Sequence, residues 1–289
     1  MILLCLSNYL NTKHRKLCIV YFIFNGNNFH MNSLEKAKKL YNSCKSLSSY
    51  KDDFQIQIND SEEAYQIQED FIKIKKLDLA DSIGGWKVAL TNPVMQKLVG
   101  VDTPAEGAIM KSLIYSNNDY LNFNNYLHLG SEAEIAIRVV KNFPKDVKKF
   151  NYIDEIIPFL GEVYAALEIV DDRHSADKSN FEYLVAQNSM NHGCVLGEPE
   201  TIDLLTLDQL EGDLIVSGEV FGSGKGKNVL QHPLNSILYL INSLIRRGRT
   251  LHEGEVILTG SIATTCWPKR GDSVEANIKG LSPVKFYVR

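Results

Sequence analysis

The chain has 289 residues, of which 44% are hydrophobic and 23% charged, close to the average of globular proteins. This length allows one large domain or two ordinary ones, and the composition excludes disordered and collagen-like classes. The formal net charge is −4 without a dense Lys/Arg cluster, so nucleic acid is not expected as the main partner. The five cysteines are scattered and form no Cys-x-x-Cys pair, which indicates reduced thiols in a cytoplasmic protein and neither a disulfide framework nor a zinc site.

Residues 1–30 carry an apolar run at 17–24 behind Lys13, Arg15 and Lys16, as a secretory signal peptide would. No small-residue cleavage site follows, and the run is far shorter than the ~20 residues that a membrane span requires. We therefore expect neither export nor a membrane anchor. A capped amphipathic helix is predicted directly after Met31, so we interpret residues 1–30 as a non-native or disordered extension and Met31 as the initiator.

Helical spacing of apolar residues predicts helices at about 34–46 and 60–74, and acidic residues suit the first turn of the second. After Gly84 and Gly85 the period changes to two, which predicts a strand at 86–90. Further strand-like runs follow at 133–140, 163–170, 194–196, 214–220, 256–259 and 284–288. One helix at 233–246 interrupts them, with Pro233 in its first turn. The sequence thus predicts an α+β fold, with a helical N-terminal region at 31–82 and one β-sheet-rich unit at 83–289.

The glycine-rich stretch at 217–227 invites comparison with a phosphate-binding loop. The spacing Gly-x-x-x-x-Gly-Lys-Ser/Thr is absent, and no helix is predicted to open at Lys225. We therefore predict a turn or hairpin there.

Two glutamates, Glu132 and Glu134, alternate with apolar residues in a predicted strand. Alternate residues of a strand share a face, so these two carboxylates should project together. Adjacent carboxylates repel each other, and solvent, a shared proton or a cation relieves the repulsion. A solvated strand face explains this pair equally well, because the opposite face can supply the burial that a one-sided sheet needs.

Glu168 lies in an otherwise apolar strand, where an ionised carboxylate is costly unless it is paired or bound to a metal. A structural ion pair with Arg173 would satisfy it. Convergence with Glu132 and Glu134 would instead supply the hard oxygen ligands that Mg²⁺ or Mn²⁺ prefers, whereas zinc more often recruits His or Cys. We favour this divalent-metal site.

Lys87 alternates with Trp86 and Val88 and therefore points away from their face of the strand. The pattern alone favours an exposed lysine over one that lines a cleft, and it favours a core position for Trp86. His128 and His192 receive no role, because a lone histidine is more often structural than catalytic.

The chain resembles the 2-oxopent-4-enoate hydratase and 4-oxalocrotonate decarboxylase group of the fumarylacetoacetate hydrolase superfamily. The resemblance covers most of residues 60–289 and rests on the order of short motifs along the chain. These motifs are AYQIQ at 64–68, GWK at 85–87, GVDTP at 100–104, EAEIA at 132–136, ALEIVD at 166–171, VLG at 195–197, HPL at 232–234 and LTGS at 258–261.

The resemblance implies the superfamily's mixed β-roll and homo-oligomeric assembly. It implies a Mg²⁺ or Mn²⁺ ion held by Glu132, Glu134 and Glu168, and a small 2-oxo or 2-hydroxy acid as the substrate. It also implies catalytic roles in the substrate site for Lys87 and Asp102.

The same resemblance implies three substrate-binding residues: Asn191, Thr259 and Ser261. One segment departs from the group, since this chain has NSMNHG at 188–193 where the hydratases look serine-rich. Asn191 would then replace a hydroxyl group as a hydrogen-bond partner, although an amide differs from a hydroxyl in size and donor geometry.

The activity that the resemblance implies is a hydratase that adds water to a 2-hydroxy-2,4-dienoate or 2-oxo-enoate to give a 4-hydroxy-2-oxo acid. A 4-oxalocrotonate-type decarboxylase would share the metal and the enolisation, so the sequence does not separate the two. An acylpyruvate C–C hydrolase is less favoured, because the His-Glu pair expected on a lid is not evident. A non-catalytic partner subunit of a related decarboxylase remains an alternative.

Overall fold

The computed structural model of the protein describes residues 31–49, 56–173 and 180–289. The interpretation of residues 1–30 lies outside these described residues. Within them, no helix combines the length and the apolar character that crossing a membrane demands.

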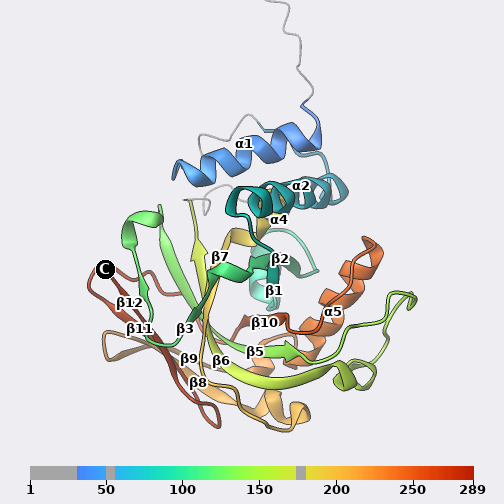
Figure 1. Ribbon diagram of the computed structural model, residues 1–289. Helices are drawn as coiled ribbons and strands as arrows, with labels where there is room; N and C mark the ends of the chain where they lie inside the picture. The colour runs from blue at the N-terminus through green and yellow to red at the C-terminus, as the bar shows by residue number, and fades with distance from the viewer. Residues whose placement is uncertain (1–30, 50–55, 174–179) are drawn as a thin grey trace, which may run out of the picture. The chain divides into compact units, whose positions relative to one another are not determined.

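Two helices, α1 (Ser33–Lys45) and α2 (Ser61–Leu79), open the described chain. Asn32 and Glu35 form a capping box at the start of α1, and the Asp60 side chain accepts a hydrogen bond from the Glu63 backbone N–H at 2.8 Å at the start of α2. The second helix runs a full turn beyond its predicted end and stops where Ala80 adopts a left-handed conformation, with φ 48°. The two helices share a buried apolar cluster, so α1 packs on α2 (Figure 1).

A seven-stranded mixed sheet follows in the spatial order β2-β1-β10-β5-β6-β7-β3. Its strands are β1 (Ile83–Ala89), β2 (Ala105–Met110), β3 (Ile114–Ser116), β5 (Leu129–Val139), β6 (Leu160–Asp171), β7 (Asn191–Leu196) and β10 (Val256–Ser261). The β1–β10 and β3–β7 pairs are parallel, and the other pairs are antiparallel. Strand β2, at one edge, also contacts β7 near the other edge, so the sheet curls into a roll.

A second sheet has five strands in the order β4-β12-β11-β8-β9. Its strands are β4 (Tyr120–Leu121), β8 (Glu211–Val216), β9 (Glu219–Lys225), β11 (Ser273–Ile278) and β12 (Val284–Val288). A two-residue turn at Ser217 and Gly218, both with positive φ, joins β8 to β9. The hairpin predicted at 217–227 is therefore confirmed, whereas the single strand predicted at 214–220 is wrong because this turn divides it.

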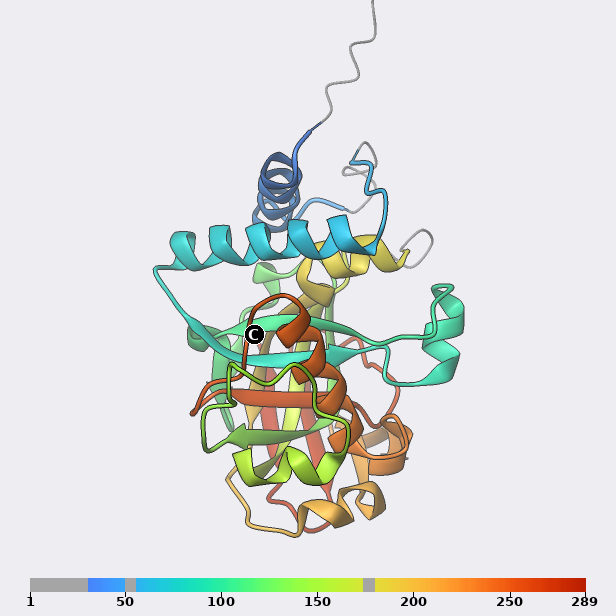
Figure 2. The same cartoon turned by 90° about the vertical axis from the view of Figure 1, so that its right-hand side faces the viewer.

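Three further helices complete the fold: α3 (Pro93–Leu98), α4 (Phe181–Ala186) and α5 (Pro233–Arg246). Short 3-10 helices lie at Lys111–Leu113, Phe123–Asn125, Ile153–Glu155, Ile157–Phe159, Asn188–Met190 (η6), Leu204–Gln209 and Gly226–Asn228. The predicted helix 233–246 coincides with α5, which carries a stripe of buried apolar residues. The helix lies against β10 and β1 (Figure 2).

The main apolar core lies between the seven-stranded sheet, the five-stranded sheet and α5, and it includes the almost fully buried Trp86. Each fully buried Leu or Ile of α5 contributes about 1.5–3 kcal/mol to this packing. The α+β prediction, with N-terminal helices followed by a mixed β-roll, is confirmed. The division into regions 31–82 and 83–289 stays a prediction.

Candidate metal centre

Two neighbouring strands bring three glutamates together. In the β5–β6 register Glu132 lies directly opposite Glu168, and Glu134 lies opposite Ala166 on the same face. One carboxylate oxygen of each glutamate lies within 4.8 Å of those of the other two. Glu134 and Glu168 are completely buried, and Glu132 is half-buried. The three side chains that the sequence selected as metal ligands thus converge on one face of the roll.

The hydrogen bonds of the three carboxylates are incomplete. Glu134 Oε2 accepts the Gly260 backbone N–H at 2.7 Å, while its Oε1 is buried without a hydrogen-bond partner. The Thr265 hydroxyl donates to Glu132 Oε1. Because a buried carboxylate oxygen without a partner is costly, Glu134 has an oxygen that a cation would satisfy.

Glu168 is held from two sides. The Asn191 side-chain amide donates to Oε1 at 3.0 Å, and Lys87 Nζ lies 3.1 Å from Oε2. The Lys87 contact is an ion pair without hydrogen-bond geometry. Since Asn191 Oδ1 is itself buried without a hydrogen-bond partner, this side chain still has an acceptor to offer. The ion-pair partner that the structure gives Glu168 is therefore Lys87.

Lys87 is 4% exposed, so the exposed lysine that its pattern favoured is wrong. It lies on β1 in the interior of the sheet, opposite Gly107 on β2 and Leu258 on β10. Burial disfavours the ammonium form, but the attraction of Glu168, Glu132 and Glu134 outweighs burial and raises the pKa of Lys87 above its usual value. The side chain is a buried cation.

Burial, together with repulsion between the carboxylates, raises the pKa of Glu134 far above its usual value and raises the pKa of Glu168 as well. Three carboxylates face one ammonium group, and a divalent cation would remove this imbalance. The donors are all oxygen atoms, the set that Mg²⁺, Mn²⁺ or Ca²⁺ prefers over a thiolate or imidazole set. The residues present fit a hard divalent cation.

The other expected site residues lie less directly on this cluster. Thr259 is buried, and its hydroxyl donates to the Ile135 carbonyl at 2.9 Å, which fastens β10 to β5. The Ser261 hydroxyl donates to the Ala263 carbonyl at 2.5 Å. Asp102 is exposed between α3 and β2, and among the described residues no hydrogen bond or ion pair joins it to the carboxylates. Substrate contact by these three residues stays a prediction.

Two contacts to the carboxylates were not predicted. Thr265 reaches Glu132 because an antiparallel bridge pairs Ser131 with Cys266. Gly260 presents its N–H to Glu134 from a backbone with φ 120°, and a Cβ there would lie 2.4 Å from Thr91 Oγ1, so glycine is required. The LTGS motif pointed to Gly260, but no local signal marks Thr265.

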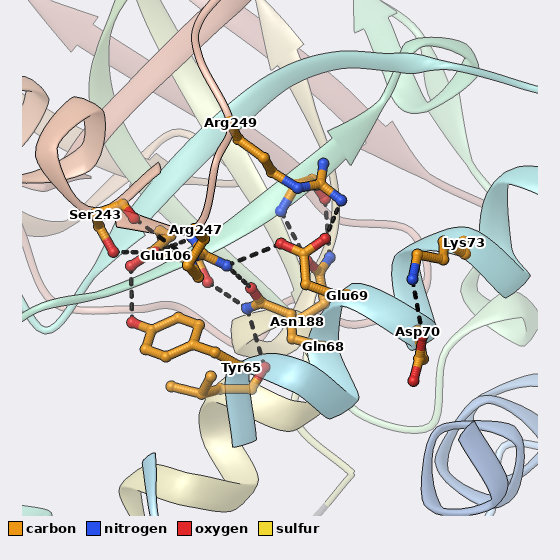
Figure 3. A network of polar contacts seen from close by, with 12 residues as sticks. Tyr65, Gln68, Glu69, Asp70, Lys73, Glu106, Asn188, Ser243, Arg247 and Arg249 are labelled. Atoms are coloured by element: carbon orange, nitrogen blue, oxygen red, sulfur yellow. Dashed lines mark hydrogen bonds and ion pairs between the residues drawn. The ribbon is translucent and has the colours of Figure 1, made fainter. Parts of the chain in front are cut away.

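Glu106 on β2 is a further buried carboxylate, and both of its oxygens have hydrogen-bond partners. It accepts hydrogen bonds from the hydroxyls of Tyr65, Tyr239 and Ser243 at 2.8, 3.1 and 2.6 Å, and it forms an ion pair with Arg247. Figure 3 shows Tyr65, Ser243 and Arg247 converging on Glu106. With all its acceptors used, Glu106 fastens α2 and the end of α5 to β2 and has no role that needs a metal.

Two surface cavities, of about 480 and 310 Å³, lie away from the carboxylates. One is lined by β8, β9 and β11, and the other lies between α2 and α5. Neither is lined by Glu132, Glu134 or Glu168, so the candidate centre is identified by its donors and its unsatisfied oxygen and not by the size of a cavity.

Comparison with known proteins gives a consistent result. Residues 122–289 match the family described as fumarylacetoacetate (FAA) hydrolase C-terminal. A 2-keto-4-pentenoate hydratase of Burkholderia vietnamiensis is 30% identical over 77% of this chain and 84% of its own, and a 4-oxalocrotonate decarboxylase of Pseudomonas putida is 30% identical over 77% and 83%. The solved structure of 4-oxalocrotonate decarboxylase from Pseudomonas putida G7, complexed with magnesium and adipate, has the same fold. It superposes with a TM-score of 0.80 at 24% identity and covers 89% of this chain and 97% of that one.

Proposed function

Because this chain belongs to the fumarylacetoacetate hydrolase family, we propose that it is a divalent-metal-dependent hydratase. It adds water to a 2-hydroxy-2,4-dienoate or 2-oxo-enoate and gives a 4-hydroxy-2-oxo acid. The observation that carries this proposal is the convergence of three carboxylates, with an unsatisfied buried oxygen, beside a buried lysine. The likeness to relatives named 2-keto-4-pentenoate hydratase supports the choice of reaction.

In this proposal Glu132, Glu134 and Glu168 hold the cation, with Mg²⁺ or Mn²⁺ favoured. When bound, the cation supplies Lewis acidity toward the 2-oxo and carboxylate oxygens of the substrate. Thr265 and Gly260 orient two of the carboxylates through the hydrogen bonds that they donate. A solved structure of the same fold is complexed with magnesium, which supports a divalent metal.

Lys87 is the group that handles charge and protons on the substrate. Its ammonium offsets the negative charge that develops when the 2-hydroxy-dienoate changes to its 2-oxo form, or it passes a proton from Nζ. Asn191 Oδ1, which has no hydrogen-bond partner, accepts a hydrogen bond from a hydroxyl group of substrate or water. Asp102, Thr259 and Ser261 complete the proposed site on the strength of the resemblance.

Decarboxylation of a 4-oxalocrotonate-type diacid is the second candidate function. A relative with that name is as similar to this chain as the hydratase is, and a solved structure of such an enzyme has the same fold. Both reactions need an electron sink at the 2-oxo group. They differ in whether water is added or carbon dioxide is lost.

One assay separates the candidates. The purified full chain is stripped with EDTA, resupplied with Mg²⁺, Mn²⁺ or Zn²⁺, and offered a 2-hydroxy-dienoate, a 4-oxalocrotonate and an acylpyruvate, with the products identified by mass. We expect activity to disappear with EDTA and to return with Mg²⁺ or Mn²⁺ more than with Zn²⁺. The expected product is the 4-hydroxy-2-oxo acid formed from the 2-hydroxy-dienoate. Full activity after metal removal would contradict the metal proposal. Carbon dioxide release would select the decarboxylase, and metal binding without turnover of any substrate would select a non-catalytic partner subunit.

Three broader properties stay proposals. Homo-oligomeric assembly rests on the resemblance, and a cytoplasmic location rests on the scattered cysteines of the sequence. A boundary near residue 82, between a helical region and a metal-binding catalytic region, rests on the change from helical to strand periodicity.

A further inference from the structure

The roll closes without a continuous ladder of backbone hydrogen bonds between β2 and β7. Strand β2 is an edge strand, and its backbone groups on the open side are bonded by side chains. The Asn188 amide makes two of these bonds: its Oδ1 accepts from the Ala108 N–H at 2.7 Å, and its Nδ2 donates to the Ala108 carbonyl at 2.8 Å. The Ser189 hydroxyl donates to the Glu106 carbonyl at 2.9 Å. Side chains of η6 thus take the place of a neighbouring strand.

The backbone of η6 is strained. Asn188, Ser189 and Met190 have φ values of 63°, 53° and 59°, three consecutive left-handed residues without a glycine. A left-handed conformation costs about 1–2 kcal/mol for each such residue, although asparagine tolerates it better than serine or methionine. Strain of this kind persists only where the surroundings impose it. The three buried bonds to β2 are the contacts that impose it.

The strained turn leads directly into the candidate metal centre. Asn191 follows it and bonds Glu168 Oε1, while Lys87, on the strand next to β2, contacts Glu168 Oε2. We call the junction where η6 and β7 meet β2 the seam. Lys87 and Asn191 come from opposite sides of this seam, and both contact the Glu168 carboxylate. The seam is also tight there: a Cβ on Gly107, which pairs with Lys87, would lie 2.5 Å from the Asn188 carbonyl oxygen.

We propose that Asn188 is a positioning residue that closes the seam between β2 and β7 and thereby holds Asn191 on Glu168. The inference rests on the proposed function, since Glu168 matters to chemistry only as a metal ligand. Asn188 itself touches neither the three carboxylates nor Lys87 in any contact of the described structure, so its effect passes through Asn191.

A matched control exists in the same chain. Asn242 on α5 makes the same two-bond contact with a backbone, accepting from the Phe150 N–H at 2.9 Å and donating to the Phe150 carbonyl at 2.8 Å, and this contact involves neither β2 nor β7. Asn188→Ala and Asn242→Ala therefore lose equivalent bonds. Mn²⁺ affinity is measured by titration calorimetry on the full chain, and amide hydrogen exchange is followed in β7.

We expect Asn188→Ala to weaken Mn²⁺ binding by about 10-fold or more, the usual effect of removing a group that orients a ligand, and to speed amide exchange in β7. Asn242→Ala should change neither. Because Asn188 acts through Asn191, the double variant with Asn191→Ala should bind Mn²⁺ no more weakly than Asn191→Ala alone.

Equal Mn²⁺ affinity in the Asn188 and Asn242 variants, or effects of Asn188→Ala and Asn191→Ala that add, would overturn the inference. If Asn188→Ala does not fold, Ser189→Ala removes a single bond of the same seam and is judged by the same comparison. A wild-type chain that binds no Mn²⁺ contradicts the proposed function instead. In that case the amide exchange rates in β7 alone test whether Asn188 closes the seam.

Discussion

At the scale of single residues, the candidate site contains more negative than positive groups, with three carboxylates and one ammonium. Lys87 neutralises one of three carboxylates, and Glu134 keeps an oxygen without a hydrogen-bond partner. Glu106, equally buried, uses both of its oxygens in a purely structural network. Burial alone does not mark a functional carboxylate. The unsatisfied oxygen is what distinguishes Glu134 from Glu106.

Lys87→Met tests the proposed chemical role at this scale. The substitution keeps most of the apolar stem and removes the ammonium, so kcat should fall by about 10²-fold or more if the charge stabilises the transition state. If Lys87 only anchors the substrate in its ground state, KM should rise with kcat nearly unchanged. Mn²⁺ binding should persist in either case, because the three carboxylates remain. Steady-state kinetics and a Mn²⁺ titration measure these quantities.

Lys36→Met is the matched control, since Lys36 is 3% exposed and forms an ion pair with Glu63 on α2, outside the candidate site. It should cost stability and leave kcat and KM unchanged. Wild-type constants in Lys87→Met would remove Lys87 from the site.

The sequence predicts these residues unequally well. Glu132 and Glu134 share a face because strand alternation is local, and an apolar strand makes Glu168 conspicuous. The burial of Lys87 could not be predicted from its pattern, because it depends on β10 joining β1 from the far end of the chain. Thr265 likewise owes its contact to a distant bridge.

At the scale of elements, α2 carries a buried lysine that the candidate site does not use. Lys75 is 8% exposed, and burial lowers its pKa to about 8, against the opposing influence of Cys44 and Asp81. It also faces His192 on β7, whose pKa burial lowers to about 3, with Lys75 adding to that effect. His192 is therefore a neutral imidazole, and Lys75 is a cation whose burial costs free energy.

Lys75→Met should therefore stabilise the protein at pH 7. The folded-state pKa lies below the ordinary value of 10.5, so the unfolded chain binds more protons between pH 8 and 10.5, and the free energy of unfolding rises with pH across that window. Below pH 8 the cost of the buried charge is fully present. Removing the charge should raise the free energy of unfolding by up to about 3 kcal/mol at pH 7 and by much less at pH 10, as measured by urea unfolding.

Lys73→Met, on the same helix but 61% exposed, is the control and should change little at either pH. A Lys75 variant less stable than the wild type at pH 7 would show that the lysine stem or an ion pair outweighs the cost of burial.

The helices and strands also fall into two groups: some follow from the local sequence pattern, and others depend on contacts with distant parts of the chain. The helix at 233–246 and the strands around Glu132 and Glu168 follow from periodicity. The last turn of α2, the edge strand β2 and the left-handed turn at Asn188–Met190 were not predicted. Three consecutive non-glycine residues with positive φ have no signature in the sequence, since bonds to a strand some 80 positions earlier hold them there.

At the scale of the whole molecule, the centre exists only when the roll is folded. Its carboxylates come from β5 and β6, its lysine from β1 and its amide from β7. The Glu106 network attaches α2 and the end of α5 to β2, and the Asn188 seam attaches β2 to β7. A cation bound by the three glutamates should therefore bind the folded chain far better than the unfolded one.

Metal binding should consequently stabilise the whole fold. A ligand that binds only the folded state raises the free energy of unfolding by about 2.7 kcal/mol when its concentration is 100 times Kd. We expect Mn²⁺ at that concentration to shift the urea midpoint of the wild-type chain upward, because the cation also relieves the repulsion between Glu134 and Glu168.

Glu168→Gln keeps the shape and removes a charged ligand, so most of the shift should disappear. Glu106→Gln should lower the midpoint, because Arg247 loses its buried partner, yet keep the full Mn²⁺ shift. Equal shifts in the wild type and Glu168→Gln would place the bound metal elsewhere in the chain.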